Sequence, residues 1–358
     1  MRSFLRLAVF LTAFLPAVAH ANATLEEIEA FQPLEVPAKP LEVAVGIEIQ
    51  QITGVDQKAE NFGVVALLRF KWTDPALSYD APAGNRDVFR ILRVDEFRDY
   101  ARERGAVLPS FEIRNQQSNR WVHQSKITLL PDGTAFYVDK SSLTLQAPYF
   151  DFTKYPFDRQ TFYFEVVSVA PEPFIKYVAA DDWSGLGGLL GEEEWILEND
   201  RMEISTIEGF TGHPSAKIAL AFEGHRHTQY YLTRIFLPML ILITVSWSAF
   251  FLDDYRKRSE VAGANLLVFV GFNWMISADL PRLGYLTFLD FILQWMFVVT
   301  GAIIVFNIFL AHLQYKGRAP LAASLDSYAI RWIYPLGYIA IVGYAVARFL
   351  KPIGAPLL

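Results

Sequence analysis

The first feature that could do chemistry is a carboxylate inside an otherwise apolar stretch, residues 256–285. The stretch is long enough to cross a membrane as one helix, since a span needs about 20 mostly apolar residues. Residues three and four positions apart share one helical face, and the face that carries the acid comprises Glu260, Ala264, Leu267, Gly271, Trp274 and Ala278. A carboxylate within a membrane usually faces water or a bundle interior and marks an ion or substrate path. We therefore expect this helix to line a pore.

Two residues of this face have a second interpretation. Glu260 could instead be an acid in the first turn of a helix, where it would pair with Arg256 or Lys257 and stabilise the helix dipole. Trp274 could form a constriction of the pore, or it could belong to the belt of aromatic residues found at membrane surfaces. Both alternatives stay open at the level of the sequence.

Enzymatic chemistry has little support. The chain has no cysteine, which excludes disulfides, thiolate metal sites and a cysteine nucleophile. The histidines are scattered, and no His-x-x-x-His pattern or glycine-rich phosphate loop is present. The adjacent pairs Asp181-Asp182 and Asp253-Asp254 would point their side chains apart on a strand. We expect no enzyme, no cofactor, no metal site and no nucleic-acid partner.

Four hydrophobic stretches, 230–252, 259–278, 287–312 and 328–350, predict four membrane spans. The connection after the first carries Arg256, Lys257 and Arg258, and the connection after the third carries Lys316 and Arg318. Short basic connections lie on the cytoplasmic side. This topology places the preceding domain and the C-terminus outside.

Residues 1–23 have the pattern of a signal peptide. A basic start precedes the apolar run, and small residues in an Ala-x-Ala pattern offer a cleavage site. A short membrane anchor is the alternative. Export agrees with the topology from the basic connections, so we expect a multi-pass protein of a bacterial inner membrane with its N-terminal domain in the periplasm.

Residues 24–229 predict an all-β domain. Apolar and polar residues alternate along 43–52 and through much of 62–72, and 130–134 has the composition of a hairpin turn. Many short antiparallel strands with almost no helical periodicity indicate a β-sandwich. Residues 87–104 are the expected exception, as a short helix or a loop.

Several short motifs resemble one known family. Tyr155-Pro156-Phe157-Asp158 is similar to an aromatic-Pro-Phe-Asp signature, and Trp72-Thr73-Asp74, Leu237-Pro238 and Asp279-Leu280-Pro281 are similar to further motifs in the same order. Together they resemble the pentameric ligand-gated ion channels, or Cys-loop receptors, in the bacterial branch that lacks the cysteines. Pro148 and Phe162 stand where animal members place their bridging cysteines. The resemblance implies an immunoglobulin-like extracellular sandwich, a four-helix transmembrane bundle, and a homopentamer of identical subunits.

The resemblance also assigns roles to the polar helix. It implies that this second span lines the pore, that Leu267 forms the central hydrophobic gate, and that five copies of Glu260 form a ring favouring monovalent cations. Cation-selective members usually carry the acid at or before the helix start, where this chain has Arg256, Lys257 and Arg258. An anion-selective channel of the same fold is therefore the alternative. A periplasmic sensor anchored by four spans without an ion path is a further one.

Coupling of the two domains is expected where the base of the β domain meets the loop after the pore helix. The residues that the resemblance implies are Asp56, Glu60, Tyr155, Pro156, Phe157, Asp158, Arg226, Pro281 and Arg282. Charge pairs at such a junction can have two arrangements, which a switch requires. The same charges could equally be solvated surface residues, which contribute little.

The ligand site expected between neighbouring β domains is poor in aromatic residues. The candidates are Arg114, Trp183, Phe210 and His213, and local loop packing is the alternative for the two aromatics. A site with Arg114 would suit an acidic ligand. Protons are the other candidate stimulus, because Glu192, Glu193, Glu194, His213, His225 and His227 could titrate near neutral pH if perturbed.

Overall fold

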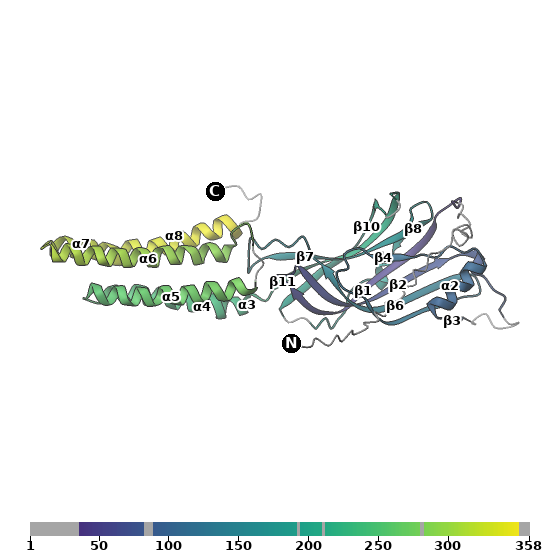
Figure 1. The fold of residues 1–358 in the computed structure, drawn as a ribbon, viewed down its shortest axis with the longest axis horizontal. Helices are drawn as coiled ribbons and strands as arrows, with labels where there is room; N and C mark the ends of the chain where they lie inside the picture. The colour runs from purple at the N-terminus through teal and green to yellow at the C-terminus, as the bar shows by residue number, and fades with distance from the viewer. Residues whose placement is uncertain (1–35, 82–88, 192–193, 210–211, 280–282, 351–358) are drawn as a thin grey trace, which may run out of the picture. The chain divides into compact units, whose positions relative to one another are not determined.

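The computed structural model describes residues 36–81, 89–191, 194–209, 212–279 and 283–350, and Lys39–Leu358 form one compact unit. The expected signal peptide, together with Phe210, Pro281 and Arg282, lies outside the described residues. Within them the chain changes from strand to helix between Arg226 and Thr228 (Figure 1).

Two sheets form the N-terminal part. The larger has seven strands among the described residues, in the order β3 (Arg90–Leu92), β5 (Trp121–Leu129), β6 (Thr134–Gln146), β2 (Asn61–Thr73), β1 (Leu41–Asp56) and β8 (Ile175–Ala179), with β9 (Gly185–Leu186) also beside β1. The smaller has the order β10 (Trp195–Glu208), β11 (Pro214–Arg226), β7 (Arg159–Pro171) and β4 (Phe111–Ile113). All pairings are antiparallel except those of β1 with β8 and β9. The prediction of an all-β sandwich is confirmed.

Alternating side chains explain this packing. Along β2 every second residue is buried, including Val64, Leu68 and Phe70. Between the sheets, the rings of Phe62, Phe162 and Phe222 have centroids 5.0 to 6.0 Å apart. These aromatic contacts pack the two sheets together in a chain that has no cysteine for a disulfide.

The predicted hairpin and the predicted helix are both present. In the turn between β5 and β6 the Leu130 N–H donates to the Thr134 carbonyl and the Gly133 N–H donates to the Leu130 carbonyl, and Gly133 takes the positive φ of 86° that the turn requires. Within 87–104 the chain forms α2 (Val94–Glu103), whose first turn is closed by the Glu96 carboxylate accepting from the Arg93 N–H.

The C-terminal part is helical. A first segment runs through α3 (Thr228–Tyr231), the π-helical η3 (Leu232–Phe236), α4 (Leu237–Ser248) and the 3₁₀-helical η4 (Ala249–Phe251). It is followed by α5 (Tyr255–Asp279), α6 (Phe288–Tyr315) and α7 (Ala319–Tyr328), and then by the π-helical η5 (Ala329–Ile333), α8 (Tyr334–Ala345) and the π-helical η6 (Val346–Leu350). The π turn of η3 lies directly before Leu237-Pro238, where proline removes a backbone donor.

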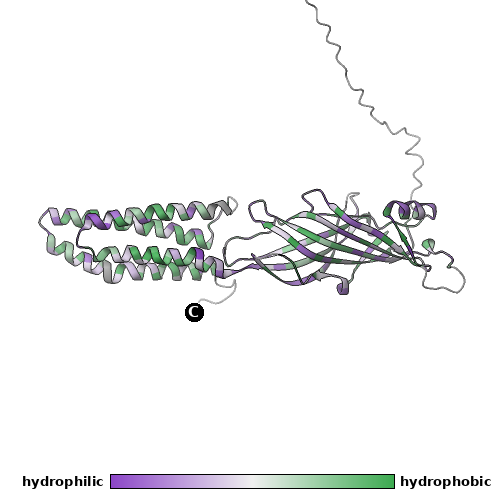
Figure 2. Cartoon of the chain, turned by 90° about the horizontal axis from the view of Figure 1, so that it is seen from below, coloured by the Kyte–Doolittle hydropathy of each residue, from purple (hydrophilic) through white to green (hydrophobic). Residues whose placement is uncertain are grey.

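Two helical segments among the described residues, Thr228–Phe251 and Phe288–Tyr315, are long and apolar enough to cross a membrane. Tyr334–Leu350 is apolar but shorter, and α5 has the length with more polar residues. In Figure 2 long apolar stretches mark the helices, whereas apolar and polar residues alternate along the strands. Helices occupy all four predicted spans, and the number that cross a membrane stays a prediction.

Candidate functional site

Helix α5 has two distinct faces in the subunit. Arg258, Ala262, Asn265 and Phe269 are buried against the rest of the chain, and their spacing of three and four defines one face. The opposite face carries the predicted pore-lining residues Glu260, Ala264, Leu267, Gly271 and Trp274, all of which are exposed. Leu267 is 73% exposed and Trp274 is 81% exposed. Ala278 lies in the last turn of α5, and its side chain is outside the described part of the structure.

Polar contacts hold the buried face in place. The Asn265 amide donates to the Ser246 hydroxyl of α4 at 2.7 Å. The Arg258 guanidinium pairs with Asp326 of α7 at 2.5 Å and donates to the Leu252 carbonyl at 2.6 Å. These bonds fix the rotation of α5 about its axis, so the face with Glu260 and Leu267 is directed away from the subunit's own helices.

The first turns of α5 contain the ion pair expected under the alternative interpretation of Glu260. Its carboxylate lies 3.4 Å from the Arg256 guanidinium, one helical turn away. Both side chains are mostly exposed, and an exposed pair of this kind contributes little. The contact therefore leaves Glu260 accessible to water or to another subunit.

Arg226, at the end of β11, is the centre of a buried charged cluster. Its Nε donates to Asp158 at 3.0 Å, and its Nη1 donates to Glu194 at 2.8 Å and to the Tyr231 hydroxyl at 3.1 Å. The guanidinium also lies over the rings of Trp195 and Tyr155, at 4.2 and 4.8 Å from their centroids. We call Asp158, Glu194, Arg226 and Tyr231 the junction cluster.

The cluster keeps its charges despite its burial. Burial by itself would lower the pKa of Arg226, but the Asp158 carboxylate and the hydroxyls of Tyr231 and Tyr155 raise it above its usual value. Burial also raises the pKa of Tyr155, which therefore keeps its proton. The Asp158 carboxylate accepts a second hydrogen bond, from Gln160 at 2.6 Å. A charged and buried Arg226 thus faces one buried carboxylate, Asp158, and one partly exposed carboxylate, Glu194.

The turn between β1 and β2 reaches this cluster through an amide. Gln57 is 8% exposed and donates to Glu194 at 3.0 Å. Asp56 instead accepts from the N–H groups of Lys58 and Ala59 and closes the turn itself. Glu60 takes a positive φ of 50°, and its carbonyl accepts from the Ala147 N–H. Of the predicted coupling charges, the structure brings Asp158 and Arg226 together and gives Asp56 a role within the turn.

Aromatic contacts join the same region to the helices. Phe157 stacks on Phe236 at 5.9 Å and meets Phe288 edge-on at 5.7 Å. Tyr155 meets Tyr231 edge-on at 5.6 Å, and Pro156 follows it in the same turn. The Phe288 N–H donates to the carbonyl of Thr153 at 2.9 Å. The aromatic-Pro-Phe-Asp motif therefore contacts both the junction cluster and the start of α6.

Three of the predicted ligand residues are described, and Arg114, Trp183 and His213 lie in separate segments of the chain. Arg114 follows β4 and lines a cavity of about 130 Å³ with Tyr149, Tyr163 and Glu165. Trp183 lies against the larger sheet, where Gly46 leaves room for it and Arg69 donates to its carbonyl at 3.0 Å.

The other two ligand candidates belong to the β10–β11 connection. His213 is exposed there, and its carbonyl accepts from the Gly209 N–H at 2.9 Å. Phe210 lies outside the described residues. A site shared by Arg114 and His213 would therefore need a neighbouring subunit.

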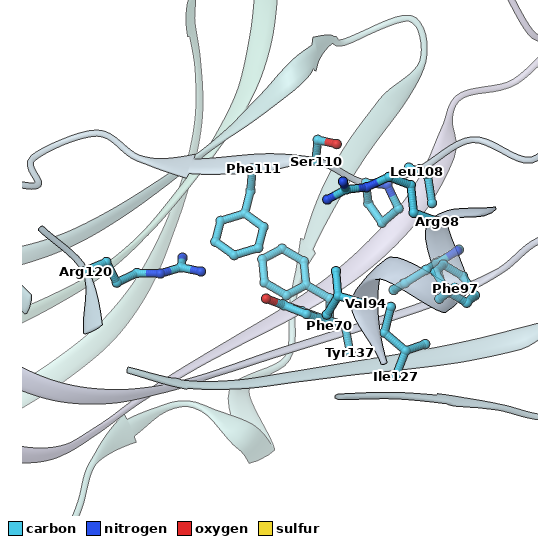
Figure 3. A pocket seen from close by; sticks show the side chains of 12 residues that line it. Phe70, Val94, Phe97, Arg98, Leu108, Ser110, Phe111, Arg120, Ile127 and Tyr137 are labelled. Carbon is cyan, nitrogen blue, oxygen red and sulfur yellow. The ribbon is translucent and has the colours of Figure 1, made fainter. Parts of the chain in front are cut away.

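A larger cavity of about 290 Å³ opens inside the sandwich between α2, β4 and the larger sheet. In Figure 3 the guanidinium groups of Arg98 and Arg120 lie on either side of the Phe70 and Phe111 rings, which stack at 4.7 Å. The Tyr137 hydroxyl also belongs to its lining. The sequence analysis did not identify this cavity, because its walls come from five separate segments that only the folded sheets bring together.

Asp139 organises the polar side of this cavity. The carboxylate is fully buried, and the same oxygen accepts from Arg120 at 3.1 Å and from the Tyr137 hydroxyl at 2.8 Å. Burial, followed by the nearby Asp139 charge, raises the pKa of Tyr137 to about 12. Arg120 is thereby partly neutralised, and Arg98 is the more exposed of the two cations.

Residues 28–182 match the model of the neurotransmitter-gated ion-channel ligand binding domain. The chain is 24% identical to the proton-gated ion channel of Gloeobacter violaceus, over 86% of this chain and 83% of that protein. Both comparisons show a likeness to the pentameric ligand-gated ion channels. It is also 22% identical to the pH-sensitive chloride channel 2 and 24% identical to the glutamate-gated chloride channel of Drosophila melanogaster. The chain spans 51% and 54% of the length of these two animal relatives.

These matches confirm the family resemblance drawn from the motifs. They also agree with an N-terminal β-sandwich of the ligand-binding type followed by helices. The names of the relatives include a proton-gated channel and two chloride channels, so the likeness alone leaves ion selectivity undecided. The pore, the selectivity and the stimulus of this pentameric ligand-gated channel homologue are therefore matters for proposal.

Proposed function

We propose that five identical subunits assemble into a cation-preferring channel in a bacterial inner membrane, with α5 lining the pore and the β domain in the periplasm. One observation carries the proposal. The buried face of α5 is fixed by Asn265 and Arg258, and the uncovered face is a continuous stripe from Glu260 to Trp274. A pore needs such a stripe from each subunit.

Selectivity follows from the charges at the start of α5. Arg258 is buried and paired with Asp326, so it is withdrawn from the uncovered face. Arg256 forms an ion pair with Glu260, one helical turn further along α5. Five Glu260 carboxylates would then form the ring nearest to the path, and carboxylate rings favour cations. An anion-selective channel is the alternative, in which exposed Arg256 and Lys257 dominate.

Leu267 forms the proposed gate. Its side chain projects from the middle of the uncovered stripe, and five such side chains would make an apolar constriction that stops ions by dewetting. Trp274 would narrow the path nearer the outer end, and Gly271 would leave a wider chamber between them. Whether water fills an apolar constriction depends on the radius of the constriction. A small rotation or tilt of α5 that widens it would therefore be enough to open the path.

Coupling is proposed to pass through the junction cluster. A stimulus that displaces the β1–β2 turn would move Gln57 and Glu194, and thereby change the pairing of Arg226. The same movement would reach the helices through Phe157 and Phe236. Ion pairs and packed rings have discrete arrangements, which a two-state switch requires. The loop with Pro281 and Arg282 is proposed as the receiving element, as the family resemblance implies.

The stimulus is proposed to be a small ligand or protons acting on the β domain. The cavity beside Arg98 and Arg120 suits an acidic ligand with an apolar or aromatic body, because two guanidinium groups border two stacked rings. The site between neighbouring subunits, with Arg114, Trp183, Phe210 and His213, is the alternative ligand position. Protons are the alternative stimulus, and the Gloeobacter violaceus relative is a proton-gated ion channel.

The natural absence of cysteine makes the pore proposal directly testable. Ala264→Cys and Gly271→Cys place a thiol on the uncovered face, and Ala262→Cys places one on the buried face. We expect a charged, water-soluble thiol reagent to block the current of the first two variants and to leave the third unchanged. Equal block of all three, or block of none, would exclude α5 as the pore lining.

A further inference from the structure

A second large cavity lies at the helix ends remote from the β domain. It has a volume of about 670 Å³ and is bordered by the end of the first helical segment, the start of α5, and α7 with η5. Four of its lining residues are aromatic: Trp247, Phe251, Tyr255 and Trp332. None of these belongs to the uncovered face of α5 or to the junction cluster.

The described residues that line this cavity carry a net negative charge. Its lining includes Asp253, Asp326 and one cation, Arg258. The Arg258 guanidinium is already bound by Asp326 and by the Leu252 carbonyl. Asp253 is exposed, and no ion pair to it is present among the described residues. A cationic group would therefore find an uncompensated carboxylate here.

The aromatic walls favour the same kind of group. Phe251 and Trp332 are 66% and 59% exposed, so their ring faces are accessible. The faces of Trp, Tyr and Phe attract an ammonium group within about 6 Å. The Ser327 hydroxyl adds a further hydrogen-bond acceptor. Asp253 and Ser327 can accept hydrogen bonds from the N–H donors of a primary ammonium, whereas a quaternary ammonium has no such donor.

The position of the cavity indicates a membrane lipid. It lies at the end of Thr228–Phe251, which is long and apolar enough to cross a membrane, and tryptophans are typical of that depth. Exposed apolar residues continue along the adjoining helices, including Ile241 on α4 and Leu336 on α8. An amphiphile could place its head group in the cavity and its chains against these helices.

We propose that this cavity binds the head group of a phospholipid with a primary ammonium, of the phosphatidylethanolamine class. The ammonium contacts Asp253 and the Trp332 ring, and the bound lipid connects the end of α4 to α7. This site is separate from the proposed ion path and does not depend on it.

Lipid binding can be measured on the purified full chain by native mass spectrometry. The probes are phosphatidylethanolamine, phosphatidylcholine and phosphatidylglycerol with identical acyl chains. We expect phosphatidylethanolamine to bind several-fold more tightly than the other two. Asp253→Asn and Trp332→Leu should each weaken its binding roughly three- to tenfold, the size of a cation–π or exposed ionic contact. Asp99→Asn on α2 and Trp295→Leu on α6 are the matched controls, and neither residue lines the cavity.

Four results would overturn the proposal. Phosphatidylglycerol binding as tightly as phosphatidylethanolamine would show that the negative charge of the cavity does not determine which head group binds. Equal binding of phosphatidylcholine would exclude the hydrogen-bonded ammonium. Unchanged binding by Asp253→Asn, with unaltered thermal stability, would place the lipid elsewhere. Displacement of the lipid by free ethanolamine at similar concentration would assign the cavity to a soluble amine.

Discussion

At the scale of single residues, Arg226 concentrates the charge of the junction. It is 1% exposed and is bound by Asp158, Glu194 and Tyr231. A buried ion pair is weak support for stability as such, but removal of one partner leaves the other charge buried and unpaired. Loss of Arg226 would therefore leave the buried Asp158 carboxylate without its cationic partner, and this would lower the stability of the folded chain.

Arg226→Gln should destabilise the folded chain by about 3 kcal/mol or more, because Asp158 is buried with it. Arg159→Gln is the matched control, since Arg159 pairs with Glu198 in an exposed position and should cost about 1 kcal/mol or less. Chemical denaturation of the two variants measures the difference. Equal losses would contradict a buried, charge-dependent junction.

Tyr137 predicts a specific pH dependence. Its pKa is raised to about 12 in the folded chain, chiefly by burial, whereas an unfolded tyrosine titrates near 10. A raised pKa gives stability that is full below pH 10 and is lost as the pH rises towards 12. The stability advantage of the native chain over Tyr137→Phe should therefore narrow between about pH 10 and about pH 12. A gap that stays constant across this range in paired denaturation curves would be inconsistent with the burial of this hydroxyl beside Asp139.

At the scale of elements, α5 separates two tasks by face. Its buried face contacts α4, α6 and α7, and its uncovered face carries the proposed pore lining. Substitutions on the uncovered face should change conduction with little effect on folding. Substitutions on the buried face should do the reverse.

Leu267→Thr tests this separation. A hydroxyl in the constriction keeps water in place, so we expect a standing current without stimulus, and folding should be unaffected. Val270→Thr is the control, because Val270 is also exposed but lies to the side of the stripe. Currents recorded in planar bilayers compare the two. If Leu267→Thr gave no standing current, or if both variants gave the same one, Leu267 would not form the gate.

At the scale of the whole molecule, periodic patterns predicted the fold well. Strand alternation predicted the sandwich, and the spacing of three and four along α5 predicted which side chains lie together. These patterns work because burial repeats with the geometry of each element. The motif Tyr155-Pro156-Phe157-Asp158 was assigned to the junction by its family resemblance and not by periodicity.

Contacts between distant segments were harder to predict. Glu194 contacts Arg226 from 32 residues away, and Gln57 donates to Glu194 from 137 residues away. Nothing in the local sequence distinguishes Gln57 from the neighbouring Asp56. The cavity beside Arg98 and Arg120 has the same origin. Sequence charge alone favoured Asp56 and Glu60 of the turn, because an acid is the simplest partner for an arginine. In the fold Arg226 pairs with Asp158 and Glu194, and the turn contributes Gln57, whose amide donates to Glu194.

The pentamer is a prediction for the whole molecule. The uncovered face of α5 would be covered or hydrated only in an assembly, and the candidate residues Arg114 and His213 do not meet in one subunit. Native mass spectrometry of the detergent-solubilised protein should give five times the mass of the mature subunit. A monomer or dimer that still reconstitutes function would contradict the proposed pore.

The most direct test of the central claim is the reversal potential of the current in a sodium chloride gradient, with the stimulus-independent Leu267→Thr variant as the open channel. A cation-preferring pore predicts reversal close to the sodium potential. Adding Glu260→Gln should move the reversal potential towards zero. Reversal close to the chloride potential, unaffected by Glu260→Gln, would contradict the account and assign the pore charge to Arg256 and Lys257.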